Sequence, residues 1–295
     1  MSKALVRLYP AAYRAAHGEE ILDVHREMTA DLSRPARLRA DADLAAHALR
    51  VRLGLDPASP AGRFFALAAP FALAAAAVDG GLYLARWYAG LVLSPAPVRI
   101  QLTTMDGAWI LYVLLSLLVC AGAIVALTGR WARGARAAVC GLLGTALCGI
   151  FATPAHREGP VAPVAALLTV AVVLACPPGR RGDRRLSTAA GAMAAVGWFP
   201  VVVVDAGAYT GALGVTTEYG AWPVLVLAFT GAVLAWRARS SGLWELGAMA
   251  VASPPLIAHA YTDAWGDLRP VLGIFLLLPL AAVLTASFRR VRRRH

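Results

Sequence analysis

Residues 64–84 read FFALAAPFALAAAAVDGGLYL, an apolar run with one charged side chain, Asp79. A helix needs about 20 predominantly apolar residues to cross the hydrocarbon core of a bilayer. Seven further apolar runs follow along the chain, at 108–128, 137–153, 161–176, 187–207, 221–236, 243–261 and 271–288. The sequence therefore predicts an all-α membrane protein with eight transmembrane helices.

The amino-acid composition also indicates a chain that lies largely in an apolar environment. Hydrophobic residues make up 59% of the 295 residues and charged residues only 15%, whereas a typical soluble domain is roughly 45–50% apolar. This excludes a disordered, collagen-like or disulfide-framework protein. The four cysteines lie inside apolar runs and form no C-x-x-C pair, so we expect neither a metal site nor a cofactor.

The positive charges are distributed unevenly about the expected spans. The formal net charge is +11, and 24 of the 28 Lys and Arg residues lie on the side that holds both termini. The opposite side has only Arg86, Arg99, Arg157 and Arg269. Because Lys and Arg concentrate in cytoplasmic loops, we expect a multi-pass plasma-membrane protein with both termini in the cytoplasm. The basic excess is explained by topology, and nucleic-acid binding is not expected.

Residues 1–62 differ in composition from the rest and predict a cytoplasmic helical hairpin followed by a linker. Pro10 and Pro35 suit the first turns of two helices. Ser33 can cap the second helix and Gly54 can end it. In each segment, residues that recur at steps of three and four would share one face of a helix, which supports the prediction of two helices. These residues are Ile21, His25, Met28 and Leu32 in the first, and Leu38, Ala42, Ala45, Leu49 and Leu53 in the second.

The start of this hairpin carries three short motifs: Tyr9-Pro10, Tyr13-Arg14 and Gly18-Glu19-Glu20. They resemble the helical prefix of a group of actinobacterial multi-span membrane proteins of uncharacterised activity. The resemblance covers only the prefix and implies a membrane protein with a cytoplasmic helical cap, without an activity or a catalytic residue. The charges of the hairpin are typical of a solvated face; the alternative is a docking site for a cytoplasmic protein within residues 1–55.

The membrane part contains an internal similarity. Two pairs of segments share unusual patterns: V-D-x-G-x-Y at 78–83 and 204–209, and T-T-x-x-G-A-W at 103–109 and 216–222. Asp, Trp and Tyr are scarce in this apolar chain, so these matches are informative. We therefore expect two parallel repeats of four helices, residues 63–186 and 187–295, related by a pseudo-two-fold axis along the membrane normal.

Charged side chains within the expected spans are few, and each costs about 2.5–3.5 kcal/mol on insertion. Asp79 and Asp205 occupy matching places in the two repeats, so we take them as the candidate ligand-binding acids and, in an enzyme, as the catalytic acids. Tyr83 and Tyr209 follow these acids by one helical turn. They can hydrogen-bond the acids or a ligand, or they belong to the interfacial aromatic belt.

Two more residues complete the candidate ligand-binding set. His259 and Asp263 lie four residues apart near the outer end of the seventh span, so they share a helix face if the helix extends that far. Asp263 can then orient the imidazole. Two such residues do not make a metal site. Together with the two acids in the repeats, they predict a cluster that faces outward.

The motifs of common soluble enzymes are absent. The sequence has no P-loop, G-x-S-x-G or H-E-x-x-H motif. The favoured hypothesis is binding and translocation of a hydrophobic or amphipathic, lipid-like ligand at an acidic site between the repeats. One alternative is a membrane-embedded enzyme that uses an Asp general acid on a lipid or isoprenoid. A second alternative is a sensor or scaffold that acts through the N-terminal hairpin.

Overall fold

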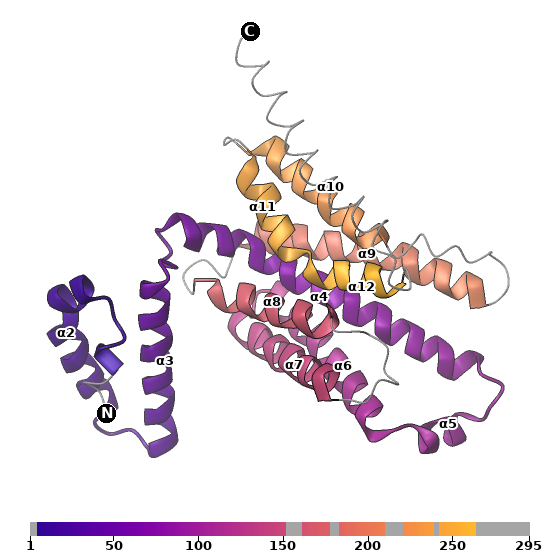
Figure 1. The fold of residues 1–295 in the computed structure, drawn as a ribbon, viewed down its shortest axis with the longest axis horizontal. Coiled ribbons are helices and arrows are strands. Elements are labelled where there is room, and N and C mark those ends of the chain that lie inside the picture. The colour runs from indigo at the N-terminus through magenta and orange to yellow at the C-terminus, as the bar shows by residue number, and fades with distance from the viewer. Residues whose placement is uncertain (1–4, 152–160, 178–182, 210–220, 239–241, 264–295) are drawn as a thin grey trace, which may run out of the picture. The chain divides into compact units, whose positions relative to one another are not determined.

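The chain is helical throughout its described part. The computed structural model describes residues 5–151, 161–177, 183–209, 221–238 and 242–263, which form eleven α-helices, α2 to α12, and no strand (Figure 1). The first of two compact units extends to Arg63, and the second begins at Phe64. The all-α class is thus confirmed, whereas the eighth expected span, 271–288, lies outside the described residues.

The first unit contains a helical hairpin of α2 (Ala11–Thr29) and α3 (Arg34–Arg52), as the sequence predicts. Pro10 immediately precedes α2. Ser33 stands at the N-cap of α3, although its side chain makes no capping hydrogen bond. Gly54 follows the end of α3 with a φ of 65°, a left-handed conformation that glycine adopts without a steric penalty.

Tyr9, from the first sequence motif, anchors the chain before α2 to the hairpin. Its side chain is fully buried, and its hydroxyl lies 2.8 Å from Nδ1 of His47 on α3. Its ring stacks on that of Tyr13, with the ring centroids 5.3 Å apart. The two tyrosines of the motif therefore have a structural role in closing the hairpin.

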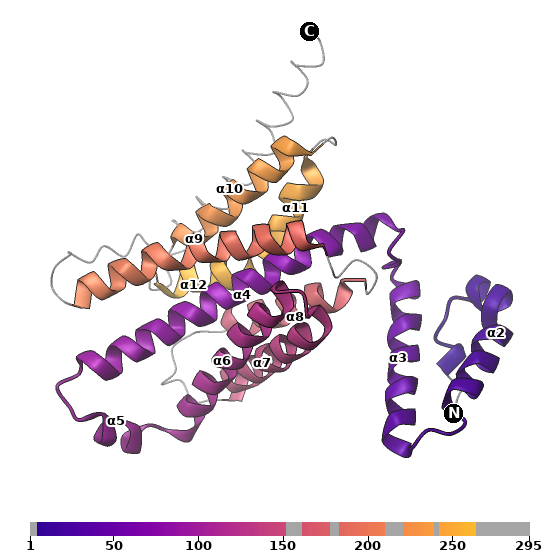
Figure 2. The same cartoon turned by 180° about the vertical axis from the view of Figure 1, so that it is seen from behind.

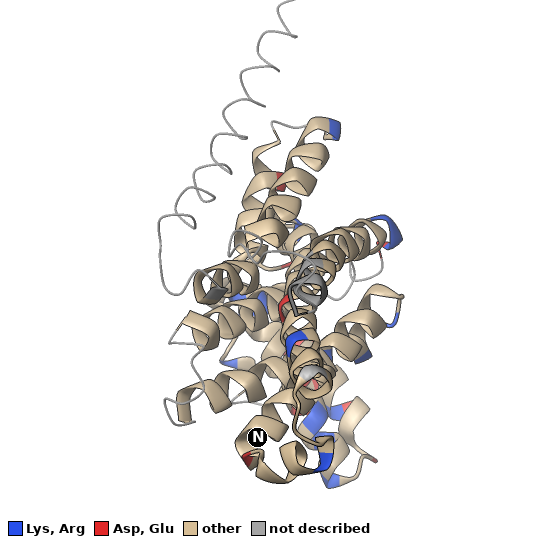
Figure 3. Cartoon of the chain, turned by 90° about the vertical axis from the view of Figure 1, so that its right-hand side faces the viewer, with Lys and Arg blue, Asp and Glu red and all other residues tan. Residues whose placement is uncertain are grey.

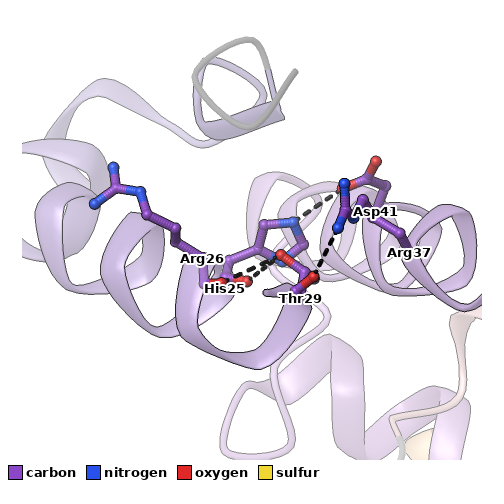
Figure 4. Close-up of polar contacts among 5 residues, drawn as sticks. All are labelled: His25, Arg26, Thr29, Arg37 and Asp41. Carbon is purple, nitrogen blue, oxygen red and sulfur yellow. Dashed lines mark hydrogen bonds and ion pairs between the residues drawn. The ribbon is translucent and has the colours of Figure 1, made fainter. Parts of the chain in front are cut away.

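A second polar contact joins the two helices near the turn between them (Figure 4). Nε2 of His25 lies 2.9 Å from Oδ1 of Asp41, and both side chains are largely buried. Arg37 donates a hydrogen bond of 3.2 Å to the carbonyl oxygen of Thr29 at the C-terminus of α2. A cation at this end of a helix satisfies a terminal carbonyl and interacts favourably with the helix dipole.

The apolar stripe of α3 does not form the hairpin interface. Leu38, Leu49 and Leu53 are exposed, whereas Asp41 and Ala48 are buried. The polar pairs determine which face of α3 meets α2, and the leucines lie on another face. The periodicity therefore predicted the helix correctly but did not identify its buried face.

The surroundings of His47 make the hairpin sensitive to acid. Burial lowers the pKa of His47 and the neighbouring Arg50 lowers it further, while Asp56 raises it. The folded hairpin therefore favours the neutral imidazole. The unfolded chain takes up a proton near the ordinary pKa of about 6.5, so this contribution to stability is complete above that pH and declines below it.

We expect amide hydrogen exchange in α2 and α3 to accelerate when the pH falls from about 7.5 to about 5.5, after correction for the intrinsic pH dependence of exchange. His47→Gln should reduce this acid-induced loss of protection, because it removes the titrating group. His17→Gln is the matched control, because His17 contacts Glu20 on its own helix, at 3.8 Å, whereas His47 contacts Tyr9, which precedes the other helix. An equal effect of the two substitutions would contradict the assignment.

The second unit begins with α4 and contains the apolar helices. Its bounds are α4 (Pro60–Leu93), α5 (Val98–Thr104), α6 (Gly107–Leu127), α7 (Trp131–Phe151), α8 (Val161–Ala175), α9 (Arg184–Tyr209), α10 (Trp222–Arg237), α11 (Leu243–Ala252) and α12 (Pro254–Asp263). Three of these, α4, α6 and α7, are long and apolar enough to cross a membrane. Figure 3 shows that Lys, Arg, Asp and Glu occupy only a small part of the described ribbon.

The packing of α6 on α7 is typical of membrane helices. Small residues lie between the helices, whereas many leucines and isoleucines of α6 are exposed on its outer face. A Cβ atom on Gly134 would collide with the backbone of Ala126 and Gly122, so the two helices approach as closely as glycine allows. Small residues inside and large apolar residues outside suit a lipid environment, because lipid solvates the large side chains.

Figures 1 and 2 show α6, α7 and α8 side by side, with α9 and α10 on the other side of α4. In the same unit, α7 packs on α8, α9 on α10, and α12 on α8. Helix α8 is the last helix of the first expected repeat, and α12 is the last described helix of the second. Their contact therefore joins the two expected repeats. The described core is therefore continuous across the two expected repeats.

Gly134→Ala should destabilise the protein by about 1–3 kcal/mol, because the added methyl group overpacks the α6–α7 contact. The matched control is Gly107→Ala, because a Cβ atom there meets nothing within 4 Å. Thermal unfolding of the two variants in the same detergent measures the difference. Equal unfolding temperatures would show that the α6–α7 contact is not tight.

Candidate functional site

The candidate site is built on α4, whose middle part is packed on all sides. Every residue from Ala68 to Ala76 is buried. A helix that is apolar all round belongs in a protein interior or a membrane. The helix continues to Leu93, well past the expected end of the first span at residue 84. Asp79 therefore lies near the middle of the helix and not close to its outer end.

Two glycines after Asp79 allow neighbouring helices to approach α4. A Cβ atom on Gly80 would lie 3.3 Å from Sγ of Cys120 on α6. A Cβ atom on Gly81 would lie 2.8 Å from Nε1 of Trp198 on α9. The Asp-Gly-Gly sequence thus places a carboxylate next to the close contacts of α4 with α6 and with α9.

The seventh expected span is interrupted immediately before the site. The sequence predicts one helix over 243–261, but the structure has α11 and α12, separated at Ser253. Pro254 and Pro255 lack the amide hydrogens that would continue the α-helical hydrogen bonds. The Ser253 hydroxyl donates a bond of 2.7 Å to the carbonyl oxygen of Ala250, which compensates for one lost donor.

The break leads into α12, which brings His259 to Asp79. Nδ1 of His259 lies 3.4 Å from Oδ1 of Asp79. The His259 side chain is 6% exposed, whereas the Asp79 side chain is 41% exposed. The imidazole is therefore covered and the carboxylate is accessible. Two residues that the sequence assigns to one ligand-binding set are in contact, although they are separated by most of the membrane part of the chain.

Two polar atoms near this pair have no hydrogen-bond partner among the described residues. They are Nε2 of His259 and Nε1 of Trp198, and both are buried. A buried donor or acceptor without a partner costs about 1–3 kcal/mol, and such groups call for an explanation such as a bound molecule. The surroundings of Asp79 can therefore accept a polar group or a water molecule.

Tyr83 lies one turn beyond Asp79 and contacts α6. Its hydroxyl accepts a hydrogen bond of 2.6 Å from Nε1 of Trp109. Its ring meets that of Tyr112 edge to face, with the centroids 4.8 Å apart. Tyr83 and Trp109, which the sequence links to the two repeated patterns, thus join α4 to the start of α6.

The other three candidate residues cannot be placed relative to this site. Asp205 and Tyr209 lie in α9, and Asp263 ends α12, but their side chains lie outside the described residues. The matching tryptophans of the expected repeats make different contacts: Trp222 donates to the carbonyl oxygen of Val196, while Trp109 donates to a tyrosine hydroxyl. The four-plus-four repeat remains a prediction.

Sequence reasoning did not identify Trp198 as a neighbour of the site. No motif surrounds it, and its role depends on how closely α9 approaches Gly81. The prolines before His259 did signal a disturbed helix, but they did not show that the disturbance directs α12 towards α4. No family model matches the chain, and neither a curated protein nor a solved structure matches it.

Gly81→Ala should destabilise the protein, by about 1 kcal/mol or more, because its methyl group meets the bulky Trp198 ring. Gly191→Ala on α9 is the control, because a Cβ atom there meets nothing within 4 Å and alanine favours the helix. The unfolding temperatures of both variants test the close approach of α9. The contact would be refuted if Gly81→Ala were as stable as the control.

Proposed function

We propose that this chain is a multi-pass plasma-membrane protein that binds and translocates a hydrophobic or amphipathic ligand in a proton-dependent manner. The observation that carries this proposal is the contact between accessible Asp79 and covered His259 inside an apolar helical unit. Ionisable side chains at membrane depth are costly, and they commonly mark substrate or proton pathways.

The Asp79–His259 pair is suited to exchange one proton. An ionised carboxylate beside an imidazolium is neutral overall, and so is a carboxylic acid beside a neutral imidazole. Either state avoids the cost of an isolated buried charge. The pair holds one proton in both states, and gain or loss of a proton leaves a net charge beside the covered imidazole. A charged group of a ligand at the accessible carboxylate changes the cost of that net charge, so ligand binding and proton binding are linked.

The interruption between α11 and α12 provides a second line of support. In membrane transporters, broken helices line binding sites because irregular backbone is tolerated only next to protein or a water-filled cavity. Here the break at Ser253 and Pro254 lies six and five residues before His259. A change in the angle between α11 and α12 would move the imidazole relative to α4.

The proposal includes the finer topology that the sequence predicts. Eight spans in two parallel repeats, both termini in the cytoplasm and a second acid at Asp205 would place an acidic site between the halves. The hairpin, with its possible partner surface within residues 1–55, would lie in the cytoplasm. The resemblance of its motifs to an actinobacterial membrane prefix is compatible with this arrangement.

Asp79→Asn should weaken the pH dependence of ligand retention, because the amide keeps the shape of the carboxylate and cannot bind the proton. We expect wild-type protein purified at about pH 5.5 and about pH 7.5 to retain a lipid-like molecule in amounts that differ about tenfold. Mass spectrometry of the bound small molecules measures this. His259→Gln should have the same effect, and exposed Asp31→Asn is the control.

The outcomes separate the three hypotheses. Identical extracts from folded wild-type and Asp79→Asn protein would contradict the proposal. A retained molecule that is chemically altered when it is returned to wild-type protein, but not to Asp79→Asn, would favour an enzyme with Asp79 as general acid. Loss of cellular function on removal of residues 1–55, with Asp79→Asn tolerated, would favour a sensor or scaffold.

A further inference from the structure

A second candidate site lies at the far end of α4, beyond Tyr83. A cavity of about 550 Å³ opens between the end of α4, α5 and the start of α6 (Figures 1 and 2 show the three helices). This volume is within the roughly 300–1,000 Å³ of typical small-molecule sites. The residues that line it are Tyr83, Arg86, Trp87, Gly90, Leu91, Ser94, Gln101, Thr104, Met105, Asp106 and Trp109.

Hydrogen bonds hold the walls of this cavity in place. Nε2 of Gln101 on α5 donates to the carbonyl oxygens of Leu91 and Ala96, at 3.2 Å and 2.6 Å. Asp106 caps α6 and accepts a bond from the amide of its second residue. The Trp109–Tyr83 hydrogen bond joins the opposite walls. A site whose walls are already ordered loses less entropy when a ligand binds.

The cavity combines apolar walls with donors for an anion. Its walls include the rings of Trp87 and Trp109 and the side chains of Leu91 and Met105. Nε1 of Trp87 is buried and has no hydrogen-bond partner among the described residues. Arg86 is the only cation among the described lining residues, and its guanidinium is suited to bind phosphate or carboxylate oxygens.

We propose that this cavity binds the anionic head of an amphipathic molecule, a phosphate or carboxylate, through Arg86 and Trp87, with the apolar body against the aromatic walls. The inference rests on the proposed function for the path of the ligand, and it names the ligand class. In the proposed topology the cavity lies on the outer side, where only four of the 28 Lys and Arg residues occur. Arg86 is one of the few positive charges on the outer side, and a role in ligand binding accounts for this exception.

Its position suits a ligand that arrives from the membrane. Tyr88, next to the lining residues, is 64% exposed. Trp and Tyr concentrate at the level of the lipid headgroups. An amphipathic molecule in the outer leaflet would have its charged head at this level. It would reach the cavity about one to three helical turns beyond Asp79 along α4.

The test uses the full-length protein in phosphatidylcholine nanodiscs, titrated with lauryl phosphate at constant pH while tryptophan fluorescence is recorded. Empty nanodiscs correct for partitioning of the probe. We expect saturable quenching in the wild type and an apparent Kd at least about tenfold weaker in Arg86→Gln. Trp87→Phe keeps an aromatic ring but removes the donor, so it should also weaken binding. Because this variant lacks one of the fluorescent tryptophans, its affinity is measured by competition between unlabelled and radiolabelled lauryl phosphate. Arg99→Gln is the control, because Arg99 is exposed on α5 and does not line the cavity.

Further probes define the ligand class. Laurate should compete with lauryl phosphate, whereas uncharged lauryl maltoside and inorganic phosphate should not. Equal binding of lauryl maltoside would overturn the role of the anion, and equal binding of inorganic phosphate would overturn the role of the apolar body. Unchanged affinity in folded Arg86→Gln and Trp87→Phe would overturn the site itself.

Asp79→Asn distinguishes this inference from the proposed function. Because Asp79 does not line the cavity, we expect Arg86→Gln to weaken lauryl phosphate binding at constant pH by the same factor in the Asp79→Asn background as in the wild-type background. Normal binding together with unaltered pH-dependent retention in Asp79→Asn would leave the cavity supported and the proton-linked function refuted. If lauryl phosphate does not bind, but Asp79→Asn changes the pH-dependent retention of the ligand, only the proposal for the cavity is refuted.

Discussion

The architecture of the second unit depends on the burial of the middle of α4 on every side. Residues 68–76 contain no side chain that can hydrogen-bond, and six of the nine are alanines, whose small size allows neighbouring helices to approach the α4 backbone. Such a helix is stable only when other helices or lipid cover it, and its backbone hydrogen bonds are satisfied within the helix itself. Packing by close approach of small residues, seen also between α6 and α7, is the main source of attraction available where lipid is as apolar as the protein.

The same constraint explains why polar side chains of α4 meet partners on other helices, as Asp79 meets His259 and Tyr83 meets Trp109. A charge beside tightly packed alanines has few partners, so Asp79 depends on a residue that another helix must supply. His259 can serve because two prolines interrupt its helix and Ser253 satisfies a freed carbonyl. Further along α4, where packing is looser and the aromatic residues begin, the helix lines a cavity with α5 and α6. One helix thus connects the contact between Asp79 and His259 with an open aromatic cavity.

The hairpin of the first unit follows a different physical logic. Its helices are held by Tyr9 with His47 and by His25 with Asp41, whereas several leucines remain exposed. Directional hydrogen bonds select the contact face, because two short, charged helices bury too little apolar surface to do so. Tyr9 and Tyr13, from the motifs near the N-terminus, therefore have a structural role in the hairpin.

The sequence by itself determined the helical class, the hairpin and the apolar character of the later helices, because these follow from local periodicity, Pro and Gly positions and segment length. It also selected Asp79 and His259, because charged groups are rare in apolar runs. The tertiary structure decided which candidates meet. It divided the seventh expected span at Ser253, turned α3 by its polar contacts and brought α9 and Trp198 against Gly81. Such contacts join residues far apart in the chain, and their geometry arises from the packing of whole helices, which no local pattern encodes.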